Sequence, residues 1–180
     1  CLLVALLTLG TTLAIRFISQ RSVNEEYIRT AASQRVTALD NILRPLSAEQ
    51  ATLLSLVDKP CMDIHLTLRK MAASLQTVRS VALVASGMIY CSSIFGQRQA
   101  DLHQLQPALP AHHPLLLFST DNSLLKGTPV LIQWYPASES GFDGVMLIVN
   151  IELLGTLILK EKSPLISDVS LQVGDHYFIS

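Results

Sequence analysis

Apolar residues change their spacing once along this chain, near Thr77, and the change separates a helical part from a sheet-forming part. Before this point apolar residues recur every three or four positions, the spacing of one face of a helix. Those of the first such stretch are Ile28, Ala32, Val36, Leu39, Leu43 and Leu46. Pro45 would clash with the carbonyl group four residues earlier, so we predict a kink or break near residue 45 of this stalk-like helix.

Two further helices are predicted before the spacing changes. Ser47 and Gln50 have the spacing of a capping box, which would restart a helix around Leu53. Asp58 is a candidate N-cap for another helix, whose apolar face continues to Leu75. The pattern therefore predicts that the first part of the chain is helical throughout.

Short runs rich in β-branched and aromatic residues follow, and such runs are typical of strands joined by turns. They are TVRSVALVAS, MIYCSS, LLLFST, TPVLIQWYP and GVMLIVNI, with SDVSLQV and HYFIS near the end. Ser86 and Gly87 are a tight-turn signal that makes the first two runs antiparallel neighbours. We predict an irregular surface loop over residues 97–114 and a helix over residues 151–162 that is capped by Asn150. Helices followed by an antiparallel sheet indicate an α+β fold.

The N-terminal segment CLLVALLTLGTTLAI contains no charged residue. Its helix would rise only about 22 Å, less than the roughly 30 Å hydrocarbon core of a bilayer. We therefore predict a truncated membrane helix over residues 1–18, an amphipathic stalk helix over residues 19–57 and one further domain over residues 58–180. A signal-peptide apolar region and a mature lipoprotein cysteine at Cys1 are the alternatives.

The composition restricts the partners of the chain. It carries 13 Lys+Arg against 14 Asp+Glu, so there is almost no net field to attract nucleic acid, and we expect no nucleic-acid partner. A charged share of 15% is low beside the usual value of about 25%, which agrees with a membrane as partner. Arg16, Arg21 and Arg29 would by themselves favour a cytoplasmic position for the residues that follow. An amphipathic helix leaving a membrane is also a pairing surface, which leaves a homodimer open.

Three cysteines supply the main candidate chemistry. Cys1 lies in the apolar first segment, where a small inert thiol is the simplest interpretation. Cys61 begins a predicted helix, whose dipole favours the thiolate, and Cys91 lies in the second arm of the predicted hairpin. In an oxidising compartment these two would form a disulfide worth roughly 3 to 4 kcal/mol. The spacing alone leaves a disulfide and two buried free thiols equally open.

The residues around both cysteines carry a resemblance to a known family. The stretch VRSVALVASGMIYCSSIFG, which contains Cys91, and the earlier Cys61 followed by Leu68 and Arg69 resemble the CSS-motif sensor domain. That domain is found in bacterial membrane proteins with a C-terminal EAL-type cyclic di-GMP phosphodiesterase. The resemblance implies N-terminal membrane and stalk helices packed on an antiparallel, PAS/Cache-like sheet, in a periplasmic domain held between two helices of the inner membrane.

The resemblance also implies roles for the motif residues. Cys61 and Cys91 would form a disulfide that restrains the cytoplasmic phosphodiesterase, with periplasmic thiol-disulfide oxidoreductases as partners. Ser92 and Ser93 complete the motif, and hydrogen bonding or close packing are roles open to such small polar residues. A divalent metal is expected only for the catalytic domain, whose carboxylates are not among these residues. We expect no cofactor and no hydrolytic activity in these 180 residues.

A second function is weighed against redox sensing. Tyr90, Arg98, Trp134 and Tyr135, with Asp143 nearby, are candidates for lining a small-molecule pocket in the sheet. Packing in the core or at a sheet edge explains the same residues. The alternative is thus an extracytoplasmic domain that binds a small ligand and carries a purely structural disulfide. The spacing of the histidines matches no common zinc pattern, so we expect no metal site.

Overall fold

The structure is a computed structural model that describes all residues except 1, 123–124, 160–169, 174–175 and 180. The chain divides into two compact units, Cys1–Ala38 and Leu39–Ser180. Cys1, expected to be an inert thiol, lies outside the described residues.

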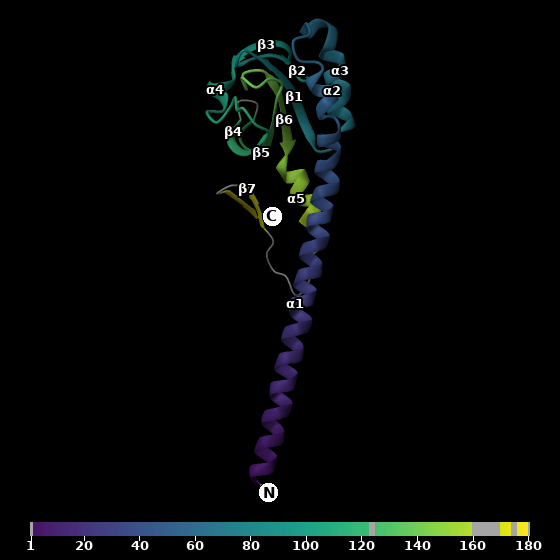
Figure 1. Ribbon diagram of the computed structural model, residues 1–180, viewed down its shortest axis with the longest axis vertical. Helices are drawn as coiled ribbons and strands as arrows, with labels where there is room; N and C mark the ends of the chain where they lie inside the picture. Colours follow the sequence, from purple (N-terminus) through teal and green to yellow (C-terminus); the bar gives the residue numbers. More distant parts are fainter. Residues whose placement is uncertain (1, 123–124, 160–169, 174–175, 180) are drawn as a thin grey trace. The chain divides into compact units, whose positions relative to one another are not determined.

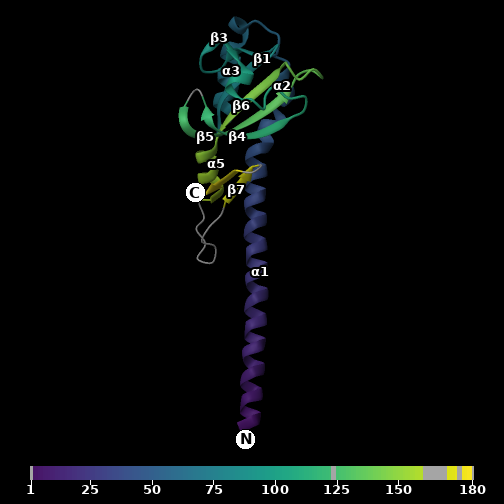
Figure 2. The same ribbon diagram turned by 90° about the vertical axis from the view of Figure 1, so that its left-hand side faces the viewer.

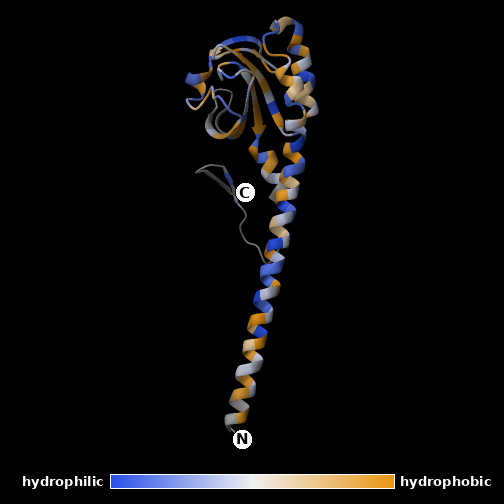
Figure 3. Ribbon diagram, in the orientation of Figure 1, coloured by the Kyte–Doolittle hydropathy of each residue, from blue (hydrophilic) through white to orange (hydrophobic). Residues whose placement is uncertain are grey.

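Helix α1 (Leu2–Ala48) covers every described residue of the first unit and ends at Ala48 in the second. Nearly all described side chains of the first unit are exposed, among them the large apolar ones of Leu7, Ile15 and Phe17. Figure 3 shows apolar residues on the turns at its N-terminal end. Within the described part of the chain, no helix has a stretch long and apolar enough to cross a membrane. The membrane helix over residues 1–18 stays a prediction.

The sequence predicts a kink or a break near Pro45, and the structure shows no break there. The helix continues through Pro45 and ends at Ala48. Leu46, which is 1% exposed, packs into the core of the second unit. The burial of this side chain offsets the hydrogen bond that a proline removes from a helix.

The two following helices begin without the caps that the sequence suggests. Helix α2 (Gln50–Leu54) follows Glu49 and has no side-chain cap, so the predicted Ser47 capping box is wrong. Helix α3 (Cys61–Ser74) starts directly after Pro60, where Asp58 was expected as the cap. Asp58 instead has a φ of 70°, a left-handed conformation in which Asp is enriched, and the chain turns there before α3.

Six strands form an antiparallel sheet in the order β3-β2-β1-β6-β5-β4 (Figures 1 and 2). They are β1 (Val78–Ala85), β2 (Met88–Ser92), β3 (Gly96–Asp101), β4 (Leu115–Asn122), β5 (Leu125–Pro136) and β6 (Gly144–Asn150). Ala85 pairs with Met88 across a two-residue turn, which confirms the predicted hairpin. Ser86 and Gly87 both have positive φ, at 50° and 75°, as a type I′ turn requires.

Both faces of this sheet are covered. In β1, Val81 and Leu83 face the helices, where α2, α3, the end of α1 and helix α5 (Ile151–Leu159) supply the apolar partners. Ala82 and Val84 face the opposite way, toward a second apolar cluster. Burial on both sides explains why the central strands are nearly continuous apolar runs and do not alternate between apolar and polar residues. These runs are drawn in orange in Figure 3.

The predicted loop over residues 97–114 is wrong in its first part. Residues up to Asp101 form the edge strand β3, and a short helix, α4 (Leu102–Leu105), follows it. The Asp101 carboxylate caps α4 by accepting the N–H of His103 at 2.9 Å. Strand β3 is polar and lacks β-branched residues, so its pairing with β2, and not its own propensity, makes it a strand.

The C-terminal elements agree with the sequence. Asn150 caps α5, since its side-chain oxygen accepts the N–H groups of Glu152 at 3.1 Å and Leu153 at 3.3 Å. Strands β7 (Ser170–Val173) and β8 (His176–Ile179) pair antiparallel in a separate two-stranded sheet. The last part of the helix predicted over residues 151–162 lies outside the described residues.

Candidate functional site at the Cys61–Cys91 disulfide

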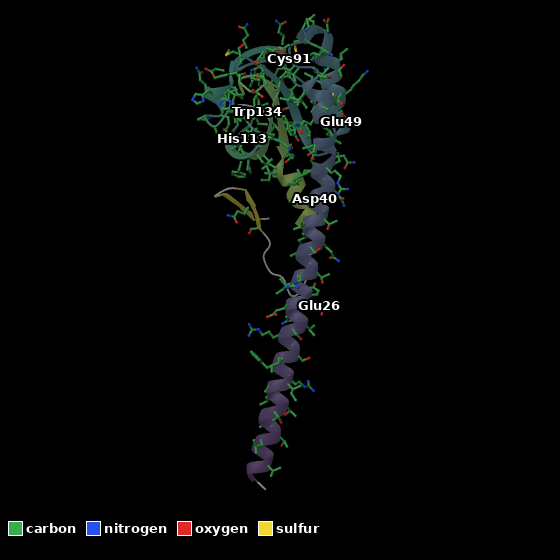
Figure 4. The ribbon with its side chains drawn as sticks, in the orientation of Figure 1. Glu26, Asp40, Glu49, Cys91, His113 and Trp134 are labelled. Carbon is green, nitrogen blue, oxygen red and sulfur yellow. A yellow bond between two sulfur atoms is a disulfide. The ribbon has the colours of Figure 1, made fainter. Side chains whose placement is uncertain are left out.

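A disulfide joins Cys61, the first residue of α3, to Cys91 in β2. The two Cα atoms are 5.3 Å apart, within the 4.4–6.8 Å range that such a bond needs. Cys91 has no exposed surface and lies on the helix-covered face of the sheet (Figure 4). The bond therefore fastens the helical layer to the second strand of the sheet.

An irregularity in β2 decides which way the residue before Cys91 points. Leu83 of β1 pairs with Cys91, but the next residue, Val84, pairs with Ile89, so Tyr90 has no partner on β1. Such a bulge leaves one residue unpaired and changes the alternation of the side chains. Ile89 packs into the cluster on the far face, whereas Tyr90 and Cys91 both pack on the helix-covered face.

The Tyr90 hydroxyl holds the bend that leads into α3. It accepts the backbone N–H of Asp58 at 3.0 Å and donates to the carbonyl oxygen of Leu56 at 3.4 Å. Burial raises the pKa of Tyr90; the hydrogen bond from the Asp58 backbone offsets part of this rise, and the Asp58 carboxylate adds to it. Tyr90 and the disulfide thus fix the two ends of the segment from Leu56 to Cys61.

The two serines after Cys91 organise the end of β2. The Ser93 hydroxyl accepts the N–H of Val81 at 3.0 Å, and its own N–H donates to the Val81 carbonyl at 2.8 Å. The Ser92 hydroxyl accepts the N–H groups of Ile94 at 3.2 Å and Phe95 at 3.4 Å. Both serines are buried, and the hydrogen bond between Ser93 and Val81 satisfies groups that water does not reach.

A surface cavity of about 280 Å³ opens beside the disulfide. Its lining residues come from the start of α3, from β2 and from β3; they are Pro60, Cys61, Met62, Tyr90, Gln97, Arg98 and Gln99. The Arg98 guanidinium lies 5.1 Å from the centre of the Phe95 ring, a distance at which a cation interacts with an aromatic face. This volume is near the lower end of the range for small-molecule sites, roughly 300–1,000 Å³.

The four residues proposed for a sheet pocket are not brought together. Tyr90 and Arg98 line the cavity, but Trp134 and Tyr135 lie in β5 on opposite faces of the sheet. Trp134, labelled in Figure 4, is fully buried and donates its ring N–H to the carbonyl oxygen of Ala111 at 2.8 Å. Burial raises the pKa of Tyr135, and the Ser47 hydroxyl beside it offsets part of that rise. Trp134 and Tyr135 are core residues.

The family model described as "CSS motif domain associated with EAL" matches residues 24–178 of the chain. The chain belongs to this family. A relative in Escherichia coli K12, "Probable cyclic di-GMP phosphodiesterase PdeD", is 47% identical over 179 residues, which are 99% of this chain and 34% of that protein. A second, PdeN, is 26% identical over 143 residues, 76% of this chain and 27% of that protein. The CSS-motif chain spans about a third of the length of these curated relatives.

Two solved structures share the fold of this CSS-motif domain. The extracellular domain of rpHK1S-Z16 has a TM-score of 0.55 at 16% identity, over 72% of this chain and 60% of that one. The ligand-binding domain of the Campylobacter jejuni chemoreceptor Tlp3, in complex with L-norvaline, has a TM-score of 0.51 at 15% identity. The match covers 78% of this chain and 65% of that one. At these identities the likeness concerns the fold alone. It confirms the α+β, Cache-like architecture.

The cavity residues of this CSS-motif domain were only partly predicted. Gln97 and Gln99 were assigned to a loop, although their exposure alternates with that of Arg98 as in a strand that has one solvated face. The sequence contains no signal for Pro60 and Met62, because nothing in it indicates that the start of α3 lies beside β3. The helices and the motif could be predicted from the sequence and the disulfide pairing from the family resemblance, whereas the cavity depends on tertiary packing.

Proposed function

We propose that this domain is the periplasmic redox sensor of a longer, inner-membrane-bound cyclic di-GMP phosphodiesterase. The Cys61–Cys91 disulfide would restrain hydrolysis in the cytoplasmic part, and its reduction would release it. The family and the names of the two relatives support the phosphodiesterase. The observation that carries the proposal is the disulfide, which joins the first residue of α3 to the sheet.

The bond is placed so that its loss changes how the helices are held. Cys61 and Cys91 belong to one buried cluster with Leu46 of α1 and Leu53 of α2. Opening the bond removes the covalent link between β2 and this helical layer. A switch requires two states separated by a few kcal/mol, and the roughly 3 to 4 kcal/mol expected from closing this loop is of that size.

Location and partners follow from the same proposal. A disulfide persists in an oxidising compartment such as the periplasm, where thiol-disulfide oxidoreductases would be its partners. The exposed apolar side chains of α1 from Val4 to Ile18 support a membrane as partner. The same helix would pair two copies in a homodimer. A divalent metal would belong to the catalytic part of the protein, and nucleic acid would not be a partner.

Cysteine substitutions in the full-length protein test the redox function. We expect Cys61→Ser and Cys91→Ser to raise cyclic di-GMP hydrolysis by similar amounts, with no further rise in the double variant, because each removes the same bond. Cys1→Ser is the matched control and should leave hydrolysis unchanged. Single variants that hydrolyse like the wild type, or a double variant whose effect is the sum of the two, would contradict redox control.

The cavity favours a second candidate, a sensor of small periplasmic solutes in which the disulfide is purely structural. Tyr90 and Arg98 give it one aromatic and one cationic side chain for recognition. A bound solute raises the melting temperature by mass action. A solute that stabilises the wild type and not the Arg98→Gln variant, together with hydrolysis that does not respond to reductant, would select this second function.

A further inference from the structure

The two sulfur-bearing residues of the disulfide differ in their access to the surface. Cys91 is 0% exposed, whereas Cys61 is 7% exposed and lines the cavity. Thiol-disulfide exchange requires a thiolate to reach one sulfur, and its rate depends on which sulfur is accessible. Access from solvent therefore leads to Cys61.

The charge of the cavity restricts the thiol that would enter it. Among the residues that line it, Arg98 is the only charged one, and Gln97 and Gln99 on the same strand add uncharged amide groups. The Arg98 guanidinium lies 5.1 Å from the centre of the Phe95 ring. A guanidinium suits a carboxylate.

Resting on the redox function proposed above, we propose that external thiols exchange with this disulfide at Cys61. We further propose that the cavity binds the reductant, a low-molecular-weight thiol that carries a carboxylate, through Arg98. Reduced glutathione is the probe that represents this class.

The exchange proceeds in two steps. The incoming thiolate attacks the Cys61 sulfur; a bond forms between the two, the Cys61–Cys91 bond breaks, and Cys91 leaves as a thiolate that takes a proton from solvent. A second thiolate then attacks the sulfur of the bound thiol and releases Cys61 as a thiolate. In total the protein disulfide gains two electrons, and two molecules of the thiol are oxidised to their disulfide.

The surroundings of Cys61 favour the second step, in which Cys61 leaves as a thiolate. Cys61 begins a helix of 14 residues, and the N-terminal end of a helix stabilises the negative charge of a thiolate. The Cys91 sulfur lies 3.9 Å from the carbonyl oxygen of Cys61, in the buried cluster. Cys61, which lines the cavity, is therefore the residue placed to form the mixed disulfide.

The test follows the oxidised chain, with Cys1 replaced by serine, as it reacts with reduced glutathione, with 2-mercaptoethanol and with cysteamine. Acid quenching and peptide mass spectrometry locate the mixed disulfide, which we expect almost entirely on Cys61. Arg98→Gln should slow the glutathione reaction about two- to fivefold, the size of one partly exposed ion pair, and leave the 2-mercaptoethanol reaction unchanged. Arg69→Gln, which removes an exposed arginine of α3 outside the cavity, is the matched control.

The single-cysteine variants provide a measurement that needs no trapping of a short-lived species. With oxidised glutathione, the free Cys61 of Cys91→Ser should react faster than the free Cys91 of Cys61→Ser. An adduct mainly on Cys91, or an Arg98→Gln effect equal for all three thiols, would overturn the proposal. If either of these results were found while hydrolysis by the full-length protein responded to reduction, redox control would be supported without thiol exchange at Cys61 through Arg98. If adducts formed on Cys61 but hydrolysis did not respond to reduction, redox control of hydrolysis would be contradicted, while thiol exchange at Cys61 would be supported.

Discussion

Tyr90 and Cys91 are neighbours in one strand, yet both side chains lie on the helix-covered face of the sheet. The bulge at Tyr90 produces this arrangement, because it interrupts the alternation that would send one of them to the other face. As a result, one strand supplies both the covalent link to Cys61 and the hydrogen bonds to the bend before α3. The following predictions test these contacts.

Reduction of the disulfide should lower the free energy of unfolding by roughly 3 to 4 kcal/mol, because the unfolded chain regains the entropy of an open loop. Urea titrations of the chain with and without reductant check this. Fluorescence of Trp134, the single tryptophan, reports on the sheet-bearing unit. The Cys1→Ser variant should keep the full difference. An unchanged urea midpoint after complete reduction would show that the bond adds no stability.

Tyr90→Phe should lower the free energy of unfolding by about 1 kcal/mol, since the N–H of Asp58 and the carbonyl of Leu56 lose their side-chain partner. The aromatic ring and its packing are retained. A Trp134 transition that Tyr90→Phe leaves unchanged would contradict a role for Tyr90 at the bend.

The raised pKa of Tyr90 predicts a loss of stability at alkaline pH. The folded protein holds the hydroxyl proton more tightly than the unfolded chain, whose tyrosines ionise near pH 10. The Tyr90 hydroxyl therefore contributes in full to the free energy of unfolding below about pH 10. This contribution is lost as the pH rises through the pKa of the folded state. In unfolding titrations from pH 8 to 11, the free energy of unfolding should decline more steeply with pH for the wild type than for Tyr90→Phe. Parallel curves would mean that Tyr90 is not the titrating group.

The two motif serines should differ in their effect on stability. Ser93→Ala leaves the buried N–H of Val81 without its acceptor and should cost about 1–3 kcal/mol. Ser92→Ala removes longer, only partly buried hydrogen bonds to the exposed residues Ile94 and Phe95, and should cost less. The paired variants control for each other in thermal unfolding. A larger loss for Ser92→Ala would reverse the roles given to them.

Gly144→Ala should destabilise the sheet by about 1–3 kcal/mol through overpacking. An added Cβ would meet the carbonyl oxygen of Tyr135 and would lie 2.7 Å from the Trp134 ring. Gly10→Ala, with nothing within 4 Å of the added carbon, is the control in α1. Calorimetry of both variants checks the difference. Gly144→Ala with the melting temperature of the wild type would show that the strands separate to accept the methyl group.

Much of the fold is encoded in short stretches of sequence. The spacing of apolar residues locates α3, the Ser86-Gly87 turn determines the first hairpin, and Asn150 marks the start of α5, because each of these depends on neighbours within a few residues. Trp134 and Tyr135 could also have been separated from the sequence, since adjacent residues of a regular strand face opposite sides.

The sequence by itself therefore determined most of the helices and strands and the motif around Cys91, and the family resemblance implied the cysteine pair. Only the tertiary structure decided that the polar segment after Gly96 is an edge strand, that Tyr90 shares a face with Cys91, and that a cavity opens beside Cys61. These features arise from pairing and packing between segments far apart in the chain. They are stabilised by residues that are distant in the sequence, so the local pattern of residues does not reveal them.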